Sequence, residues 1–193
     1  MFYEMIIFSL LSIITAIIVL LIQKRTFDFN RSKINVRGYK VIILAAVIKI
    51  AAEFLFKKYT SIGLLRILSL NWIIYIALLY VSFFNIKKSY MMLFFLGTLF
   101  NFVAIAANDF KMPVYVSELL SDFEAKKTFL LSGKDLVHSL LTDETKLKFL
   151  CDIITLHPPY PFPKTISVGD VFLLSGIFAF WQDLFFENQI SKH

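Results

Sequence analysis

Residues 5–22 read MIIFSLLSIITAIIVLLI, an uninterrupted apolar stretch without a charged side chain. A helix of this length can span the hydrocarbon core of a bilayer, which needs roughly 17 to 25 apolar residues. A cleavable signal peptide has a shorter apolar region and a basic start, whereas Glu4 precedes this stretch. We therefore predict a first membrane helix that remains in the mature protein.

The composition agrees with a membrane protein. Of the 193 residues 58% are hydrophobic and 22 are Phe, and the mean hydropathy is +0.72; soluble domains have roughly 45–50% apolar residues. The net charge of +6 does not indicate nucleic acid, because the basic residues gather beside apolar segments. Residues 1–193 are predicted to form a single polytopic membrane domain.

Four further apolar segments follow the first, near residues 39–59, 67–86, 90–107 and 168–186. Their lengths predict an all-α fold, an integral membrane helical bundle with about five transmembrane helices. A polar loop, residues 109–165, separates the fourth span from the fifth.

The basic residues set the expected orientation. The loop from Gln23 to Lys40 carries six of them against one acidic residue, Asp28. By the positive-inside rule this loop is cytoplasmic. Alternation along the chain then predicts a multi-pass protein of the cell membrane, in contact with membrane lipids, with the N-terminus outside, loop 109–165 extracytoplasmic and the C-terminus cytoplasmic.

The long loop is patterned as a helical layer. Apolar residues recur at helical spacing over residues 115–123 and 136–141, and Thr142 can cap a third helix that carries Leu147, Phe149, Leu150 and Ile153. The proline-rich segment His157–Pro163 favours an extended strap back to the membrane. Its alternative is a proline-rich ligand for another protein.

Two motifs at the ends of this loop resemble a known family. NDFKMPV, residues 108–114, resembles the N-G-G-x-M-P-V signature of uncharacterised bacterial polytopic membrane proteins, the domain of unknown function family 5317. Thr145, Leu150 and Asp152, then SVGD at 167–170 and Gly176, resemble its T…L-x-D…S-x-G-D…G pattern. The resemblance implies a five-span fold and no known activity. Asp109 and Phe110 stand where the family has two glycines, a pair whose N–H groups could cradle an anion.

These motifs supply a candidate outer site, which would form if the fourth and fifth spans are neighbours. Each also has a structural explanation, because Ser167 and Asp170 have the spacing of a helix capping box and Pro113 can end a helix. The candidate residues are Asn108, Asp109, Met112, Pro113, Asp152, Ser167, Gly169 and Asp170.

Charged residues inside the second and third segments form another candidate group. Lys49 and Glu53 share a helix face, and an antiparallel hairpin would bring Arg66 to a similar depth. The predicted cluster of Lys49, Glu53 and Arg66 is either a clamp between two helices or a site for ions, protons or a lipid head group.

Catalytic signatures are absent from the sequence: it contains no H-E-x-x-H, G-x-S-x-G, P-loop or G-x-G-x-x-G motif. His138 and His157 fit no compact ligand spacing, so neither a metal nor a cofactor is predicted. A single cysteine, Cys151, excludes an internal disulfide.

Three functions from different classes remain open. The leading one is a non-enzymatic membrane component that binds a partner protein or ligand through its outer loop. The second is a small transporter or channel built around the buried charges, as a homo-oligomer. The third is a membrane enzyme acting on an envelope or lipid-linked substrate through Asp109, His138, Asp152 or Asp170.

Overall fold

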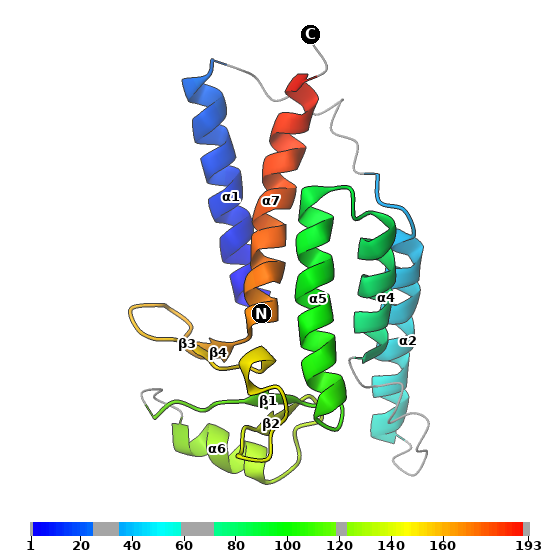
Figure 1. The fold of residues 1–193 in the computed structure, drawn as a ribbon, viewed down its shortest axis with the longest axis vertical. Coiled ribbons are helices and arrows are strands. Elements are labelled where there is room, and N and C mark those ends of the chain that lie inside the picture. Colours follow the sequence, from blue (N-terminus) through cyan, green and yellow to red (C-terminus); the bar gives the residue numbers. More distant parts are fainter. Residues whose placement is uncertain (1, 25–34, 59–71, 119–122, 191–193) are drawn as a thin grey trace.

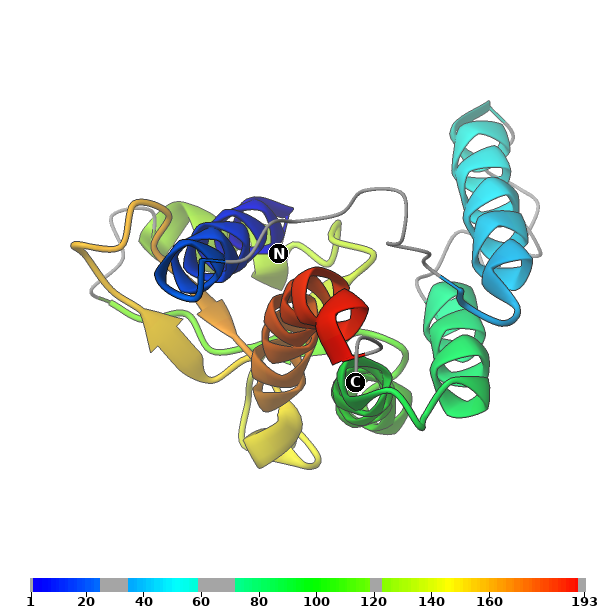
Figure 2. The same ribbon diagram turned by 90° about the horizontal axis from the view of Figure 1, so that it is seen from above.

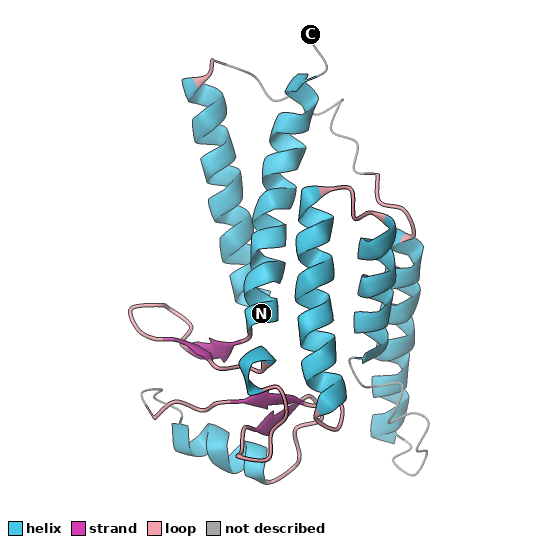
Figure 3. Ribbon diagram, viewed as in Figure 1, coloured by secondary structure: helices cyan, strands magenta, loops and turns pink. Residues whose placement is uncertain are grey.

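The computed structural model describes residues 2–24, 35–58, 72–118 and 123–190. Among these residues, five helices run side by side, and a cap formed by residues 109–165 lies across one end of them (Figures 1 and 3). The helices are α1 (Phe2–Ile22), α2 (Tyr39–Lys58), α4 (Trp72–Phe84), α5 (Ser89–Ala107) and α7 (Val168–Ile190).

The helices form a curved row and not a closed ring (Figure 2). Helix α7 packs against α1 and α5, and α4 packs against α5 and α2. A row leaves much apolar surface uncovered: Leu10, Ile14 and Leu21 of α1 are each more than half exposed. Apolar surface of this extent is what helices surrounded by lipid present.

Three of the helices are long and apolar enough to cross a membrane, over Tyr3–Ile22, Ser89–Ala107 and Val168–Phe186. Helix α2 has similar length, but Lys49 and Glu53 interrupt its apolar sequence. Helix α4 has 13 residues; residues 67–71 of the predicted segment lie outside the described part of the chain, and residues 85–86 form a turn. Each predicted segment thus contains a helix in its described part.

Glycines bring α5 and α7 unusually close. A Cβ atom on Gly169 would lie 2.7 Å from the carbonyl oxygen of Gly97 and 2.1 Å from Oδ1 of Asn101. A Cβ atom on Gly97 would lie 2.6 Å from the carbonyl oxygen of Gly169. Small residues permit such backbone contact between membrane helices. The contact places Asn101 beside the first turn of α7, where Asp170 lies.

The cap mixes helix and strand, which corrects the all-α prediction to a mainly helical fold. Strands β1 (Met112–Val114) and β2 (His138–Leu140) pair in parallel. Strands β3 (Ile154–Leu156) and β4 (Lys164–Ile166) pair antiparallel. Helix α6 (Phe123–Leu131) and the 3₁₀ helix η1 (Lys148–Leu150) complete the cap.

Non-local pairing overrides the helical periodicity expected in the cap. The helix predicted over 115–123 is absent from residues 115–118, and residues 119–122 lie outside the description. The stretch 136–141 contains β2, and the helix expected after Thr142 shrinks to η1. The N–H of Met112 donates to the carbonyl of Val137 at 2.8 Å. Short apolar runs fit either structure, so tertiary hydrogen bonds decide between them.

The proline-rich segment also differs from the prediction. Residues 157–163 form the loop of the β3–β4 hairpin, closed by a 3.0 Å hydrogen bond from the N–H of Tyr160 to the carbonyl of His157. The chain returns to the helices through β4, which leads directly into α7.

Candidate functional site

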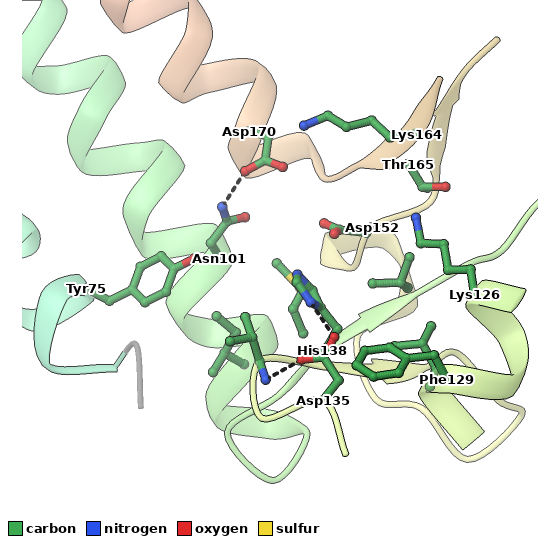
Figure 4. A pocket seen from close by; sticks show the side chains of 15 residues that line it. Tyr75, Asn101, Lys126, Phe129, Asp135, His138, Asp152, Lys164, Thr165 and Asp170 are labelled. Atoms are coloured by element: carbon green, nitrogen blue, oxygen red, sulfur yellow. Dashed lines mark hydrogen bonds and ion pairs between the residues drawn. The ribbon is translucent and has the colours of Figure 1, made fainter. Parts of the chain in front are cut away.

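A cavity of about 320 Å³ lies between the cap and the adjoining ends of α5 and α7. Ligand sites typically have volumes of about 300–1,000 Å³, so this one suits a small molecule. Six helices and strands contribute polar side chains to it, and Figure 4 displays them around a central Asp152. They are Tyr75, Asn101, Lys126, His138, Lys164, Thr165 and Asp170.

Backbone pairing fixes Asp152 at the cavity wall. Its N–H donates to the carbonyl of Pro113 at 3.0 Å, and its carbonyl accepts from Tyr115 at 2.8 Å. The side chain is 8% exposed, yet Oδ1 has no hydrogen-bond partner among the described residues. Burial, followed by the charge of Asp170, raises the pKa of Asp152 to about 8, against the opposing effects of Lys164 and Lys126. At neutral pH the protonated carboxyl therefore predominates.

Asp170 is held by a buried network at the start of α7. Ser167 Oγ accepts the N–H of Asp170 at 2.9 Å, and Asp170 Oδ2 accepts the N–H of Ser167 at 3.4 Å. These reciprocal bonds are the predicted capping box. Asn101 adds a link from α5, since its Nδ2 donates to Asp170 Oδ1 at 2.9 Å and its Oδ1 accepts from Ser167 Oγ at 2.7 Å. Asp170 thus caps a helix and also lines the cavity.

A second carboxylate orients His138. Asp135 Oδ1 accepts the N–H groups of Val137 at 2.7 Å and His138 at 3.0 Å, and Oδ2 lies 3.1 Å from His138 Nδ1. Burial alone would raise the pKa of Asp135, but these bonds hold it below its usual value. A neutral His138 that donates from Nδ1 keeps Nε2 as an acceptor. No group of three or more His, Cys, Asp or Glu among the described residues is placed to hold a metal ion.

Lys164, in the cavity wall, forms an ion pair with the first helix. Its Nζ lies 2.7 Å from Oε2 of Glu4, a carboxylate that is only 2% exposed. Tyr160 donates its hydroxyl to Oε1 of the same carboxylate at 3.2 Å. Glu4 therefore anchors α1 to the β3–β4 hairpin.

Three other predicted residues lie in or beside the cavity. Met112 lines it directly. Pro113 is buried on β1 and supplies the carbonyl that holds Asp152. Gly169 permits the helix contact that brings Asn101 to Asp170.

Asn108 and Asp109 have a different role, because they form the turn after α5. Asn108 Nδ2 donates to the carbonyls of Ala104 at 2.8 Å and Lys146 at 2.9 Å. Asp109 and Phe110 have φ values of 52° and 58°, a region that favours glycine. The two glycines of the resembled family would thus ease a left-handed turn at these positions. Neither residue lines the cavity.

The predicted intramembrane cluster is described only in part. Lys49 Nζ donates to Glu53 Oε1 along one face of α2, as their spacing predicts. Arg66 lies outside the described residues. Neither member of this pair lines the cavity.

Several lining residues were missed by sequence reasoning. Lys126, Asp135 and Lys164 lie in the loop without a recognisable motif. Glu4 does not line this cavity but pairs with Lys164, and the sequence indicated it only as evidence against a signal peptide. The one available signal was Glu4 itself, because a carboxylate beside a membrane helix calls for a basic partner.

Comparison with known proteins gives one match. The model of a "Family of unknown function" matches residues 33–182, which include the whole cap. Neither a curated protein nor a solved structure matches the chain.

Proposed function

The chain belongs to DUF5317, a family of unknown function, and from that premise we propose that it is a multi-pass membrane protein that binds a small polar ligand beneath its cap. The observation that carries the proposal is Asp152, a nearly fully buried residue that lines the cavity and whose Oδ1 has no hydrogen-bond partner among the described residues. Burying an unsatisfied polar group costs stability. A ligand that donates hydrogen bonds to Asp152 would offset that cost.

The proposed topology has five spans, with the cap and the N-terminus outside. Its support is the positive-inside rule together with the arrangement in Figure 1, where the start of α1 and the cap lie at the same end of the helices. The connection between α4 and α5, which contains Lys87 and Lys88, lies at the opposite end of the helices from the cap, as does the end of α1. The ligand would then enter from the extracytoplasmic side.

Binding without catalysis is the leading function, and a membrane enzyme is the second candidate. The enzyme is favoured by one observation: His138, oriented by Asp135, lies in the same cavity as Asp152, which is protonated at neutral pH. An imidazole acceptor and a carboxyl donor in one cavity have the properties of a general base and a general acid. Transport through a single copy receives less support, because the helices form a row (Figure 2).

Native mass spectrometry of the protein purified in mild detergent tests the proposal. Wild type should retain a small molecule that Asp152→Asn loses. Asp143→Asn, which alters a fully exposed carboxylate of the same cap, should retain it. The proposal fails if wild type carries no bound molecule, or if Asp152→Asn retains as much as wild type. A bound molecule that is chemically converted during incubation would favour the enzyme.

A further inference from the structure

Charged side chains line the cavity from two sides. Asp170 lines it from the first turn of α7 and Lys126 from α6, with Asp152 of the cap between them (Figure 4). A carboxylate on one side and an ammonium on the other indicate a ligand with two charged ends.

Neither Asp170 nor Asp152 forms an ion pair among the described residues. Asp170 accepts from an amide and a backbone N–H, both neutral donors. Lys164 of β4 lowers the pKa of Asp152 but is itself paired with Glu4. Asp152 Oδ1 is unpartnered among the described residues. A primary ammonium has three donors and one positive charge, which suits the carboxylate of Asp170 and the carboxyl group of Asp152, whose ionised form a bound cation would favour.

Within the described part of the chain, Lys126 is also free of direct polar contacts, although its charge acts on Asp152 at longer range. Lys126 is half-buried, and within the described residues it forms neither an ion pair nor a hydrogen bond. Lysine binds phosphate as a point charge. His138 lines the same cavity and can add a hydrogen bond.

We propose, building on the ligand-binding function above, that the ligand is an ammonium–phosphate zwitterion, with its ammonium on Asp152 and Asp170 and its phosphate on Lys126. The ligand is a free amino-alkyl phosphate or the head group of an aminophospholipid, and these two sources share the same chemistry.

The surroundings of the cavity suit a lipid source. A second, apolar cavity of about 480 Å³ lies between α1, the β3–β4 hairpin and α7, with Phe8, Ile166 and Leu174 in its wall. Adjacent residues divide between the two cavities: Thr165 and Asp170 line the polar one, whereas Ile166 and Val171 line the apolar one. A head group and part of an acyl chain would find matching surfaces on the two sides of this boundary.

Calorimetric titration of the full-length protein in detergent tests the charge assignment. The probes are O-phosphoethanolamine, ethanolamine as the ammonium alone, and inorganic phosphate as the anion alone. O-Phosphoethanolamine should bind at least about tenfold more tightly than either fragment. Lys126→Met should remove that advantage while leaving ethanolamine affinity unchanged, Asp152→Asn should abolish both, and Asp143→Asn should bind like wild type.

Reconstitution distinguishes the two sources. If the source is a lipid, nanodiscs of phosphatidylethanolamine should raise the thermal midpoint over nanodiscs of phosphatidylglycerol, and Lys126→Met should cancel the increase. If the source is a free molecule, soluble O-phosphoethanolamine should produce the increase in both lipids.

Different results would overturn the zwitterion proposal and the ligand-binding proposal. Equal affinity for ethanolamine and O-phosphoethanolamine, or unchanged binding in Lys126→Met, overturns the zwitterion but leaves ligand binding at Asp152 intact. Absence of an effect from both O-phosphoethanolamine and phosphatidylethanolamine also overturns it. The loss of any Asp152-dependent bound molecule in native mass spectrometry would overturn the proposed function itself.

Discussion

Asn101 on α5 donates a hydrogen bond from Nδ2 to Oδ1 of Asp170 on α7, at 2.9 Å, and both side chains are buried. The same amide accepts the hydroxyl of Ser167 at 2.7 Å. One side chain thus joins two long apolar helices and sets the position of a carboxylate in the cavity wall. Without this amide, the buried side chains of Ser167 and Asp170 would each lose a hydrogen-bond partner.

Asn101→Leu should therefore lower the free energy of unfolding by about 1–3 kcal/mol, because it leaves polar groups unsatisfied. Thermal unfolding in detergent measures the effect. The matched control is Thr98→Val on the same helix: Thr98 is fully buried, and its Oγ1 has no partner among the described residues. The control should be neutral or stabilising, and a comparable loss in both variants would contradict the network's importance.

Asp152 should make stability depend on pH. Burial and Asp170 raise its pKa to about 8 in the folded protein, against about 3.9 in an unfolded chain. Between these values the folded state holds a proton that the unfolded state has released. The stability of wild type should therefore fall as pH rises, by at most about 1.4 kcal/mol per pH unit, and level off above pH 8.

Asp152→Asn removes this dependence, so the two proteins should differ little near pH 4 and most at pH 9. Thermal midpoints across that range measure the difference. Parallel curves for the two proteins would show that Asp152 has an ordinary pKa.

The ion pair of Glu4 and Lys164 should be strongly coupled. Removing one partner of a buried pair leaves an uncompensated charge, at a cost of about 3–5 kcal/mol. Glu4→Gln and Lys164→Met should each destabilise the protein, and the double variant should cost less than the sum of the two. A double-mutant cycle measures this coupling. The exposed pair of Lys148 and Asp143, 3.5 Å apart, should give no measurable coupling.

The helices were more predictable than the cap for a physical reason. Membrane helices need long apolar runs, and such runs as 5–22 and 90–107 leave a strong signal in one sequence. The cap strands have three residues each and depend on partners far along the chain. Met112 pairs with His138, which no local pattern indicates.

The same contrast between local and non-local signals explains why only part of the candidate site was predicted. Asp152 and Asp170 stood in recognisable motifs, so the sequence pointed to both. Lys126 and Asp135 joined them only through the folding of the cap. Asn108 was also proposed for the site, but it holds the turn after α5 and does not line the cavity, because a polar residue after a helix can hold a turn as readily as a ligand.

The glycine contact between α5 and α7 should be intolerant of added volume. Gly169→Ala would put a methyl group 2.1 Å from Asn101 Oδ1 and 2.7 Å from the carbonyl of Gly97. The backbone carbonyl of Gly97 cannot move away without shifting the whole helix. We therefore expect loss of the folded protein in detergent, measured by size-exclusion chromatography. Gly133→Ala is the control: it meets nothing within 4 Å, although its φ of +68° should cost about 1 kcal/mol. Equal yields of both variants would contradict the close helix contact.

Cys151 offers a probe of whether the cap opens. The side chain is fully buried, and burial, with a smaller effect of Asp152, raises the pKa of its thiol to about 11. The thiolate is the reactive form, so N-ethylmaleimide near neutral pH should leave Cys151 unmodified on a timescale that labels an exposed thiol. Ser132→Cys in a Cys151→Ala background provides that thiol, because Ser132 is exposed in the same cap. Mass spectrometry follows both reactions. If Cys151 is labelled as fast as the exposed thiol, the cap opens freely, and the buried environment of Asp152 would be transient.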